Sequence, residues 1–347
     1  MNVSPLGKTG LQVPPVIFGS SSLGNLFQEY PKKDKVAILK EIFQATSPNT
    51  VFDTAGKYGA GLALEVLGDF LQEAGIKKED VIISNKLGWV RVPLEAVEPT
   101  FEPGIWKGIE HDAVQKISYT GMMECFEKDN ALLQGYKPQL ISLHDPDEYL
   151  MAAKGEQEKT HRWGQILEAY RALEDLKKTG KVLGIGVGAK DWTIIRRICQ
   201  EISLDYVMLA NSLSPYSHPP ELMEFVESLR KKEVGIINAA IFHSGFLVGE
   251  DYFDYRKIDP NSPEGKEKFS WRQRFFETCT QYKVAPYHAC IQFSLAIPGV
   301  GSIALSINHP DWIRKNIQAV NEKLPASFWQ ELIDKSLISN FPFLTSE

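Results

Sequence analysis

The sequence has few cysteines and no excess of positive charge. Its four cysteines, Cys125, Cys199, Cys279 and Cys290, stand far apart and form no C-x-x-C pair. This spacing excludes a disulfide framework and a zinc motif and is typical of reduced thiols in a cytosol. The net charge of -6 provides no electrostatic footprint for nucleic acid or an anionic membrane. We therefore expect neither as a partner.

Long hydrophobic runs are also absent. The first seven residues have neither the basic nor the apolar region of a signal peptide. The most apolar long stretch, 234–248, contains Asn238, His243 and Ser244 and is too short to span a bilayer. Hydrophobic residues at 43% and charged residues at 24% describe an ordinary soluble protein. With no linker-like segment, the sequence predicts a cytoplasmic protein with a single domain over 1–347.

Short apolar runs alternate with longer amphipathic stretches along most of the chain. Strands are expected near 15–19, 50–54, 81–86, 139–144, 182–187, 205–210, 234–239 and 300–304. Helices are expected near 34–46, 61–74, 119–134, 164–179, 192–202, 219–232, 271–296 and 326–338. Eight strands alternating with helices predict the α/β class and a (β/α)8 TIM barrel. Residues 6–13, with Thr9-Gly10 as turn, predict a small N-terminal β-hairpin before the barrel.

Two connections, 88–116 and 243–270, are long enough to form lids or binding segments at the C-terminal rim. Their aromatic side chains Trp89, Trp106 and Tyr252 are candidates for stacking on a substrate ring. An equally plain interpretation is that each of them anchors its own loop. The polar stretch 151–158 is expected to be a solvated loop.

Four side chains able to carry charge or a proton follow three of the expected strands. Asp53 and Tyr58 follow the strand near 50–54, Lys86 ends the next, and His144 ends the one after. Strand ends of a parallel barrel share one rim. An ammonium beside a phenol stabilises the phenolate, so Lys86 is expected to lower the pKa of Tyr58. Asp53 would orient Lys86 and His144 would bond the reacting oxygen, a set suited to reversible hydride transfer at a carbonyl.

None of these residues is decisive alone. Asp53 could be a helix cap, Lys86 a solvated lysine, and the segment at His144 an ordinary turn. A metal site at His144, Asp145 and Asp147 lacks a second histidine, so no metal is expected. A barrel hydrolase using carboxylates such as Glu65 or Asp145 has no pair specified by spacing.

The order of these motifs resembles the aldo-keto reductase family over nearly the whole chain. The resemblance runs through Leu6–Val13, Phe18-Gly19, Phe52–Gly59, Ser84-Asn-Lys86, His144–Asp147 and Leu173–Val187, and ends near Asn316. It implies that Asp53, Tyr58, Lys86 and His144 are the catalytic four. The long insertion before His144 and the segment 241–247 are most similar to the D-threo-aldose 1-dehydrogenase branch, with the plant L-galactose dehydrogenases second.

The resemblance also implies a nicotinamide dinucleotide along the C-terminal half of the rim. Its contacts would come from Gly19, Ser20, Asn211, Phe242, Ser244, Gly245, Asn308, Trp312 and Asn316. Gly188 and Ala189 stand where the family often has Ser-Asn, and the glycines of 184–188 have the wrong spacing for a dinucleotide fingerprint. Asn308, His309 and Trp312 replace the cations that often hold the 2′-phosphate of NADP, and Asp311 adds negative charge. NAD or NADP is expected, with a lean to NAD.

The leading hypothesis is an NAD(P)-dependent sugar 1-dehydrogenase that oxidises the C1 hydroxyl of L-fucose, L-galactose or D-arabinose to the lactone. Tyr58 would take the hydroxyl proton. One alternative is an aldehyde or ketone reductase of the same fold, and another is a cofactor-binding module that senses redox state and regulates a partner. The expected partner is a small sugar or carbonyl compound, and the protein a monomer or a small homo-oligomer.

Overall fold

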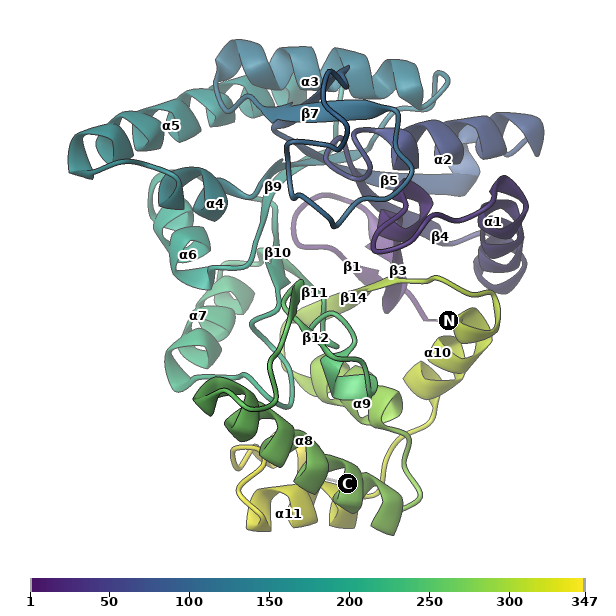
Figure 1. Ribbon diagram of the computed structural model, residues 1–347, viewed down its shortest axis with the longest axis vertical. Helices are drawn as coiled ribbons and strands as arrows, with labels where there is room; N and C mark the ends of the chain where they lie inside the picture. The colour runs from purple at the N-terminus through teal and green to yellow at the C-terminus, as the bar shows by residue number, and fades with distance from the viewer. Residues whose placement is uncertain (1, 346–347) are drawn as a thin grey trace.

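A closed barrel of eight parallel strands forms the centre of the molecule (Figure 1). The computed structural model describes residues 2–345. In order around the barrel the strands are β3 (Val16–Gly19), β4 (Thr50–Ala55), β5 (Val81–Leu87), β8 (Leu140–His144), β9 (Gly184–Ala189), β10 (Tyr206–Ala210), β11 (Gly235–Ala239) and β14 (Val300–Ser306), and β14 pairs back to β3. The predicted (β/α)8 barrel is confirmed.

Helices surround the barrel in Figure 1. They are α1 (Lys32–Thr46), α2 (Leu62–Glu73), α3 (Tyr119–Leu132), α4 (Pro146–Met151), α5 (Glu156–Lys178), α6 (Trp192–Glu201), α7 (Pro220–Lys231), α8 (Pro263–Gln281), α9 (Pro286–Ala296), α10 (Asp311–Asn321), α11 (Ala326–Asp334) and α12 (Pro342–Thr345). Each long helix turns an apolar stripe inward, as α2 does with Leu64, Leu67 and Leu71. Across residues 2–345, none of the helices has the length and apolar character that a membrane span requires.

The predicted N-terminal hairpin fills one end of the barrel. Strands β1 (Ser4–Pro5) and β2 (Gln12–Val13) pair antiparallel, and Leu6 between them is buried in the apolar cluster inside the barrel. Gly7 has a φ of +51°, and a Cβ there would lie 2.4 Å from the backbone nitrogen of Gly235. Only glycine permits this close approach. Residues 2–345 also contain three short 3₁₀ turns: η1 (Ser21–Gly24), η2 (Lys78–Asp80) and η3 (Phe246–Val248).

Both long connections contain more regular structure than the sequence predicted. In the first, β6 (Trp89–Pro93) and β7 (His111–Gln115) pair antiparallel. The second contains the hairpin of β12 (Tyr252–Phe253) and β13 (Arg256–Lys257), and then the first turns of α8.

One helix prediction and one loop prediction were wrong. The single helix expected over 271–296 is two helices, because α8 ends at Gln281, just before Lys283 adopts a left-handed φ of 56°, and Pro286 occupies the first turn of α9. The loop expected over 151–158 covers only 152–155, since α4 ends at Met151 and α5 begins at Glu156.

Candidate active site

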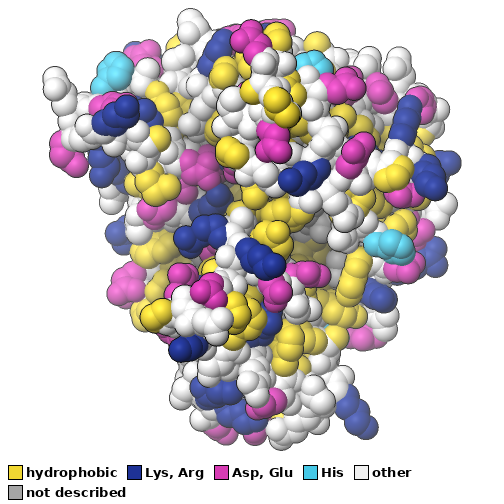
Figure 2. All heavy atoms as spheres, viewed as in Figure 1, with side chains coloured by type: hydrophobic (Ala, Val, Ile, Leu, Met, Phe, Trp, Pro, Cys, Tyr) yellow, Lys and Arg dark blue, Asp and Glu magenta, His cyan; other side chains and the backbone are white. Residues whose placement is uncertain are grey.

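A cavity of about 530 Å³ opens at the carboxyl ends of the barrel strands. Figure 2 shows hydrophobic and charged side chains mixed around a hollow near the middle of this face. The volume lies within the usual range for small-molecule sites. The rim is also where barrels of this architecture carry their chemistry. Asp53, Tyr58, Lys86 and His144 all line this cavity, so the structure brings the four predicted residues together.

Lys86 and Asp53 form a buried ion pair at the base of the cavity. They project from neighbouring strands, β5 and β4, and the Lys86 ammonium bonds directly to Asp53 Oδ2. The ammonium also lies 4.8 Å from the centroid of the Tyr58 ring. Gly188 on β9 leaves room for this lysine, since a Cβ there would lie 2.9 Å from Lys86 Cδ. Gly188 therefore allows the Lys86 side chain to pack closely against the backbone of β9.

His144 stands beside the tyrosine at the end of β8. The two rings are 5.8 Å apart and meet edge to face at 86°. Burial, followed by the charges of Lys86 and Lys57, holds the pKa of His144 well below its usual value, so the imidazole is neutral at neutral pH. Its Nδ1 is buried without a hydrogen-bond partner among the described residues, and Nε2 lies 3.5 Å from Asp145 Oδ2. A neutral imidazole can donate one hydrogen bond to a substrate oxygen.

The prediction about the acidity of Tyr58 was wrong for the protein without bound ligands. Burial raises the pKa of Tyr58 well above its ordinary value, and the charge of Asp53 raises it further. The charge of Lys57 lowers it, by less than burial raises it. Asp53 is bonded to Lys86 and its negative charge also faces the phenol, so the pair brings no net positive charge to it. The phenol is therefore protonated at neutral pH.

Lys57 is a cavity-lining residue that was not predicted from the sequence, although it directly precedes Tyr58 within the motif Phe52–Gly59. Its side chain is 4% exposed, and its ammonium contacts three carboxylates. Asp145 Oδ2 and Glu102 Oε1 lie at 2.7 Å, and Glu148 Oε2 lies at 3.0 Å. The position of this lysine next to Tyr58 was the feature of the sequence that could have indicated a role in the site. Its carboxylate partners, however, are 45 to 91 positions away in the sequence, so no local pattern connects them.

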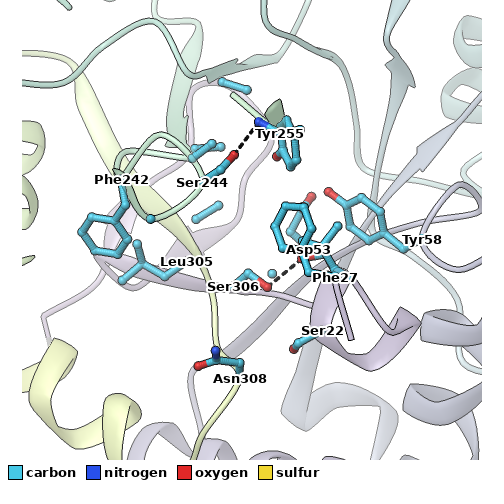
Figure 3. Close-up of a pocket in the computed structure, with 18 of the residues that line it drawn as sticks. Ser22, Phe27, Asp53, Tyr58, Phe242, Ser244, Tyr255, Leu305, Ser306 and Asn308 are labelled. Atoms are coloured by element: carbon cyan, nitrogen blue, oxygen red, sulfur yellow. Dashed lines mark hydrogen bonds between the residues drawn. The ribbon is translucent and has the colours of Figure 1, made fainter. Parts of the chain in front are cut away.

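Aromatic side chains form the upper wall of the cavity. Trp106 lies 5.8 Å from the Tyr58 ring, and Phe27 lies 4.9 Å from Tyr252. In Figure 3, Phe27, Tyr58 and Tyr255 gather around the same space. Trp106 and Tyr252 line the cavity as predicted, and so do Phe27 and Tyr255, for which no role was predicted.

Trp89 is placed differently from the prediction. It is not among the residues that line the cavity. Its ring packs 5.8 Å from Phe101 and 4.9 Å from the Lys57 ammonium. The indole therefore contacts Lys57 without lining the cavity.

A hydrogen-bonded Ser-His-Asp chain lies outside this cavity. Ser214 Oγ and Asp254 Oδ1 each lie 2.8 Å from a ring nitrogen of His243. Ser214 and His243 are each 1% exposed, and neither lines the cavity. A substrate carbonyl cannot reach such a buried serine. These hydrogen bonds instead hold Asp254, which directly follows strand β12 with Tyr252, against His243.

Comparison with known proteins assigns the family. The family model described as "Aldo/keto reductase family" matches residues 15–336. This chain is an aldo/keto reductase. Membership in the family makes it an NAD(P)-dependent oxidoreductase.

Relatives of known activity match almost the full length of this aldo/keto reductase. A pyridoxal 4-dehydrogenase of Microbacterium luteolum is 30% identical, with 96% of this chain and 97% of the relative covered. A D-threo-aldose 1-dehydrogenase of Pseudomonas sp is 26% identical, with 95% and 96% covered. An L-galactose dehydrogenase of Arabidopsis thaliana is 24% identical, with 95% and 91% covered. The predicted likeness to the last two is confirmed, whereas the likeness to the first was not predicted from the sequence.

A solved structure supports the fold. The aldo-keto reductase AKR11C1 of Bacillus halodurans, in its holo form, covers 100% of both chains with a TM-score of 0.71 at 20% identity. At this identity the likeness establishes the barrel and no more.

The C-terminal half of the rim offers groups suited to the dinucleotide of this family. Most of the predicted cofactor residues line the cavity: Gly19, Phe242, Ser244, Gly245, Asn308, Trp312 and Asn316. Figure 3 shows Phe242, Ser244 and Asn308 on this side, with Asp53 and Tyr58 opposite. Ser20 and Asn211 do not line it; Ser21 and Ser22 are the cavity-lining serines after β3.

An unpartnered polar atom on this half indicates that a polar ligand belongs here. The side-chain oxygen of Asn316, which lines the cavity, is buried with no hydrogen-bond partner among the described residues. Leaving such a group unpaired is costly. An amide-bearing, hydroxyl-rich molecule such as a nicotinamide dinucleotide would satisfy this oxygen, so the residues present fit this cofactor.

Proposed function

We propose that this aldo/keto reductase oxidises the ring hydroxyl of a small cyclic hemiacetal to a lactone, with NAD(P) as hydride acceptor. A hydride leaves the hemiacetal carbon, and the hydroxyl proton leaves to Tyr58. The two electrons reduce the nicotinamide, and a C=O double bond forms in the product. The observation that carries the proposal is the meeting of Tyr58, Lys86 and His144 at the base of one cavity.

The substrate class is supported by the relatives together with the shape of the cavity. Pyridoxal and free aldoses both close into cyclic hemiacetals, and the named relatives act on pyridoxal and on sugars. Aromatic side chains such as Phe27 and Trp106 can stack on the flat face of either ring. Charged groups such as Glu102 can bond the ring hydroxyls. L-Fucose, L-galactose, D-arabinose and pyridoxal therefore form the first substrate panel.

Each catalytic side chain has a defined role in this proposal. His144, neutral because of its lowered pKa, donates a hydrogen bond to the reacting oxygen and fixes its direction. Lys86, held by Asp53, lies next to the Tyr58 ring, but the pair adds no net positive charge to the phenol. The oxidised cofactor, when bound, would supply the hydride acceptor and a positive charge that favours the phenolate. The Tyr58 proton would then leave to solvent before turnover, and the phenolate takes the substrate proton as the hydride leaves.

One observation favours the reverse reaction as a second candidate. The pKa of Tyr58 is raised above its usual value by burial and by Asp53, so the phenol of the free protein is ready to donate a proton. A proton donor is what carbonyl reduction requires. Reduction of an aldehyde by the same site is therefore the alternative, and turnover rates measured in both directions discriminate between them.

The proposed cofactor is NAD. Asn308 and Trp312, where a cation would hold a 2′-phosphate, line the cavity without charge. Arg314 on α10 faces Glu41 of α1 in an ion pair, which keeps its guanidinium engaged away from the cavity. The Lys315 ammonium lies 4.6 Å from the centroid of the Trp312 ring, but Lys315 does not line the cavity. A doubly charged phosphate therefore finds few charge-assisted bonds of the kind that NADP binding uses.

The test is a spectrophotometric screen of the four hemiacetals with NAD and with NADP. Formation of the reduced nicotinamide with at least one of them, together with its loss in Tyr58→Phe, supports the proposal. Turnover only of aldehydes, and only with reduced cofactor, would replace it with the reductase. Tight cofactor binding with no turnover in either direction would favour the redox-sensing module.

A further inference from the structure

Lys57 joins two walls of the cavity through its three carboxylate partners. Towards the first wall, it bonds Glu102, whose other oxygen accepts a hydrogen bond from Trp106 Nε1 at 2.8 Å. Trp106 in turn lies beside Tyr58. This chain of contacts runs from the catalytic loop to the long connection between β6 and β7.

Towards the second wall, Lys57 bonds Glu148 at the start of α4. The second oxygen of Glu148 bonds the ammonium of Lys190, which follows β9 and lies 4.9 Å from the centroid of the Tyr255 ring. Tyr255 is held by a hydrogen bond from its backbone nitrogen to Ser244 Oγ, visible in Figure 3. The contacts from Lys57 therefore also reach the β12–β13 hairpin.

A third contact links Lys57 to the catalytic histidine. Asp145 Oδ2, which accepts a bond from the Lys57 ammonium, also lies 3.5 Å from His144 Nε2. Asp145 adopts the left-handed conformation, with a φ of 53°. A non-glycine residue in this conformation needs support from its surroundings, and the bond from Lys57 is one such support.

We propose that Lys57 is a positioning residue that sets the substrate site by fixing Glu102, Asp145 and Glu148 around one ammonium. The inference rests on the proposed function for the choice of substrate only. Without that ammonium, three carboxylates would face one another in a poorly solvated space, where like charges repel strongly. Among the described residues, Lys190 pairs directly with Glu148 and acts on Asp145 only at longer range, so Glu102 and Asp145 would move apart. Trp106 and the His144 ring would then lose their fixed positions.

The experiment compares Lys57→Met with Lys57→Arg in the full-length enzyme. Lys57→Met removes the charge at similar length, and we expect KM for the best substrate to rise at least about tenfold, since small misplacements cost this much. The Kd for reduced cofactor should stay within about twofold, because the cofactor half is untouched. Lys57→Arg keeps the charge and should restore most of the KM. The matched control is Lys177→Met, which breaks the Lys177–Asp205 ion pair away from the cavity and should leave KM unchanged.

A KM for Lys57→Met within about twofold of wild type, in a folded protein, overturns the inference, as would a failure of Lys57→Arg to restore it. If Lys57→Met does not fold, Glu102→Gln takes its place, and a rise in KM supports the inference while an unchanged KM overturns it. Should no hemiacetal react, KM is measured for 4-nitrobenzaldehyde in the reductive direction, which separates a wrong substrate from a wrong role for Lys57. If no compound reacts, tryptophan emission decides: a shift in Lys57→Met that is absent in Lys57→Arg supports the inference, and identical spectra overturn it.

Discussion

Asp129 makes the stability of this protein depend on pH in a direction opposite to that of most aspartates. It lies buried on α3, and its Oδ2 accepts a hydrogen bond from Asn85 Nδ2 at 2.8 Å. A Cβ on Gly56 would lie 3.0 Å from Asp129 Oδ1, so the carboxyl packs under the catalytic loop. Burial raises its pKa to about 7, against the lowering effects of Asn85 and Arg91. The folded protein therefore holds a proton here that the unfolded chain releases.

The size of the effect follows from linkage. The folded pKa is raised above the unfolded value of about 3.9, so the stabilisation is complete below the unfolded pKa and is lost as pH rises through the folded one. Between about pH 5 and pH 8 the free energy of unfolding should fall by roughly 2.5 kcal/mol from this group alone. Asp129→Asn keeps an acceptor for Asn85 and carries no charge, so it should remove this dependence.

The assay is urea unfolding of wild type and Asp129→Asn across that pH range. The difference between the two proteins isolates this one group, because all other titrating residues are shared. Asp112→Asn is the control: hydrogen bonds from Thr100 and from the backbone hold the pKa of Asp112 below its usual value, so its ionisation is complete before the range begins. Equal pH slopes for wild type and Asp129→Asn would refute the reasoning.

Three further substitutions test the active site. Tyr58→Phe should lower kcat by about 10²- to 10⁴-fold and leave the Kd for NADH unchanged, since only a hydroxyl is lost; stopped-flow and fluorescence titration measure the two, and a kcat near wild type would contradict the mechanism. Gly188→Ala places a methyl group 2.9 Å from Lys86 Cδ and should lower kcat by about 10²-fold at near-normal melting temperature; unchanged turnover would show that Lys86 needs no such path. Asn308→Arg should tighten NADPH binding about tenfold or more through a charge-assisted bond with no gain for NADH, and equal gains for both would argue against a 2′-phosphate contact at this position.

The sequence was sufficient to place the four candidate catalytic residues around one cavity, because their positions depend on local patterns. Apolar runs mark β4, β5 and β8, and a parallel barrel brings the ends of those strands to one rim. The β6–β7 hairpin was not predicted, since its strands pair across a long irregular connection, and the Pro103-Gly104 turn signal within it does not join the two strands directly.

The electrostatics of the site could not be read from the sequence either. The pKa of Tyr58 depends on how deeply its ring is buried and on which charges face it, and both are properties of the assembled barrel. Lys57 was missed for a related reason: each of its partners comes from a different segment, and no spacing rule joins them. Trp89 was misplaced because an aromatic residue in a rim connection can face either side of it.

The apolar plug formed by the N-terminal hairpin has a kinetic consequence. Leu6 and its neighbours fill the opposite end of the barrel, while one cavity is lined by both Tyr58, on the proposed substrate side, and Asn308, on the proposed cofactor side. Two ligands that enter through the same opening cannot pass each other freely. The ligand that binds deeper has to bind first and dissociate last, so we expect an ordered kinetic mechanism, which the product-inhibition pattern would reveal.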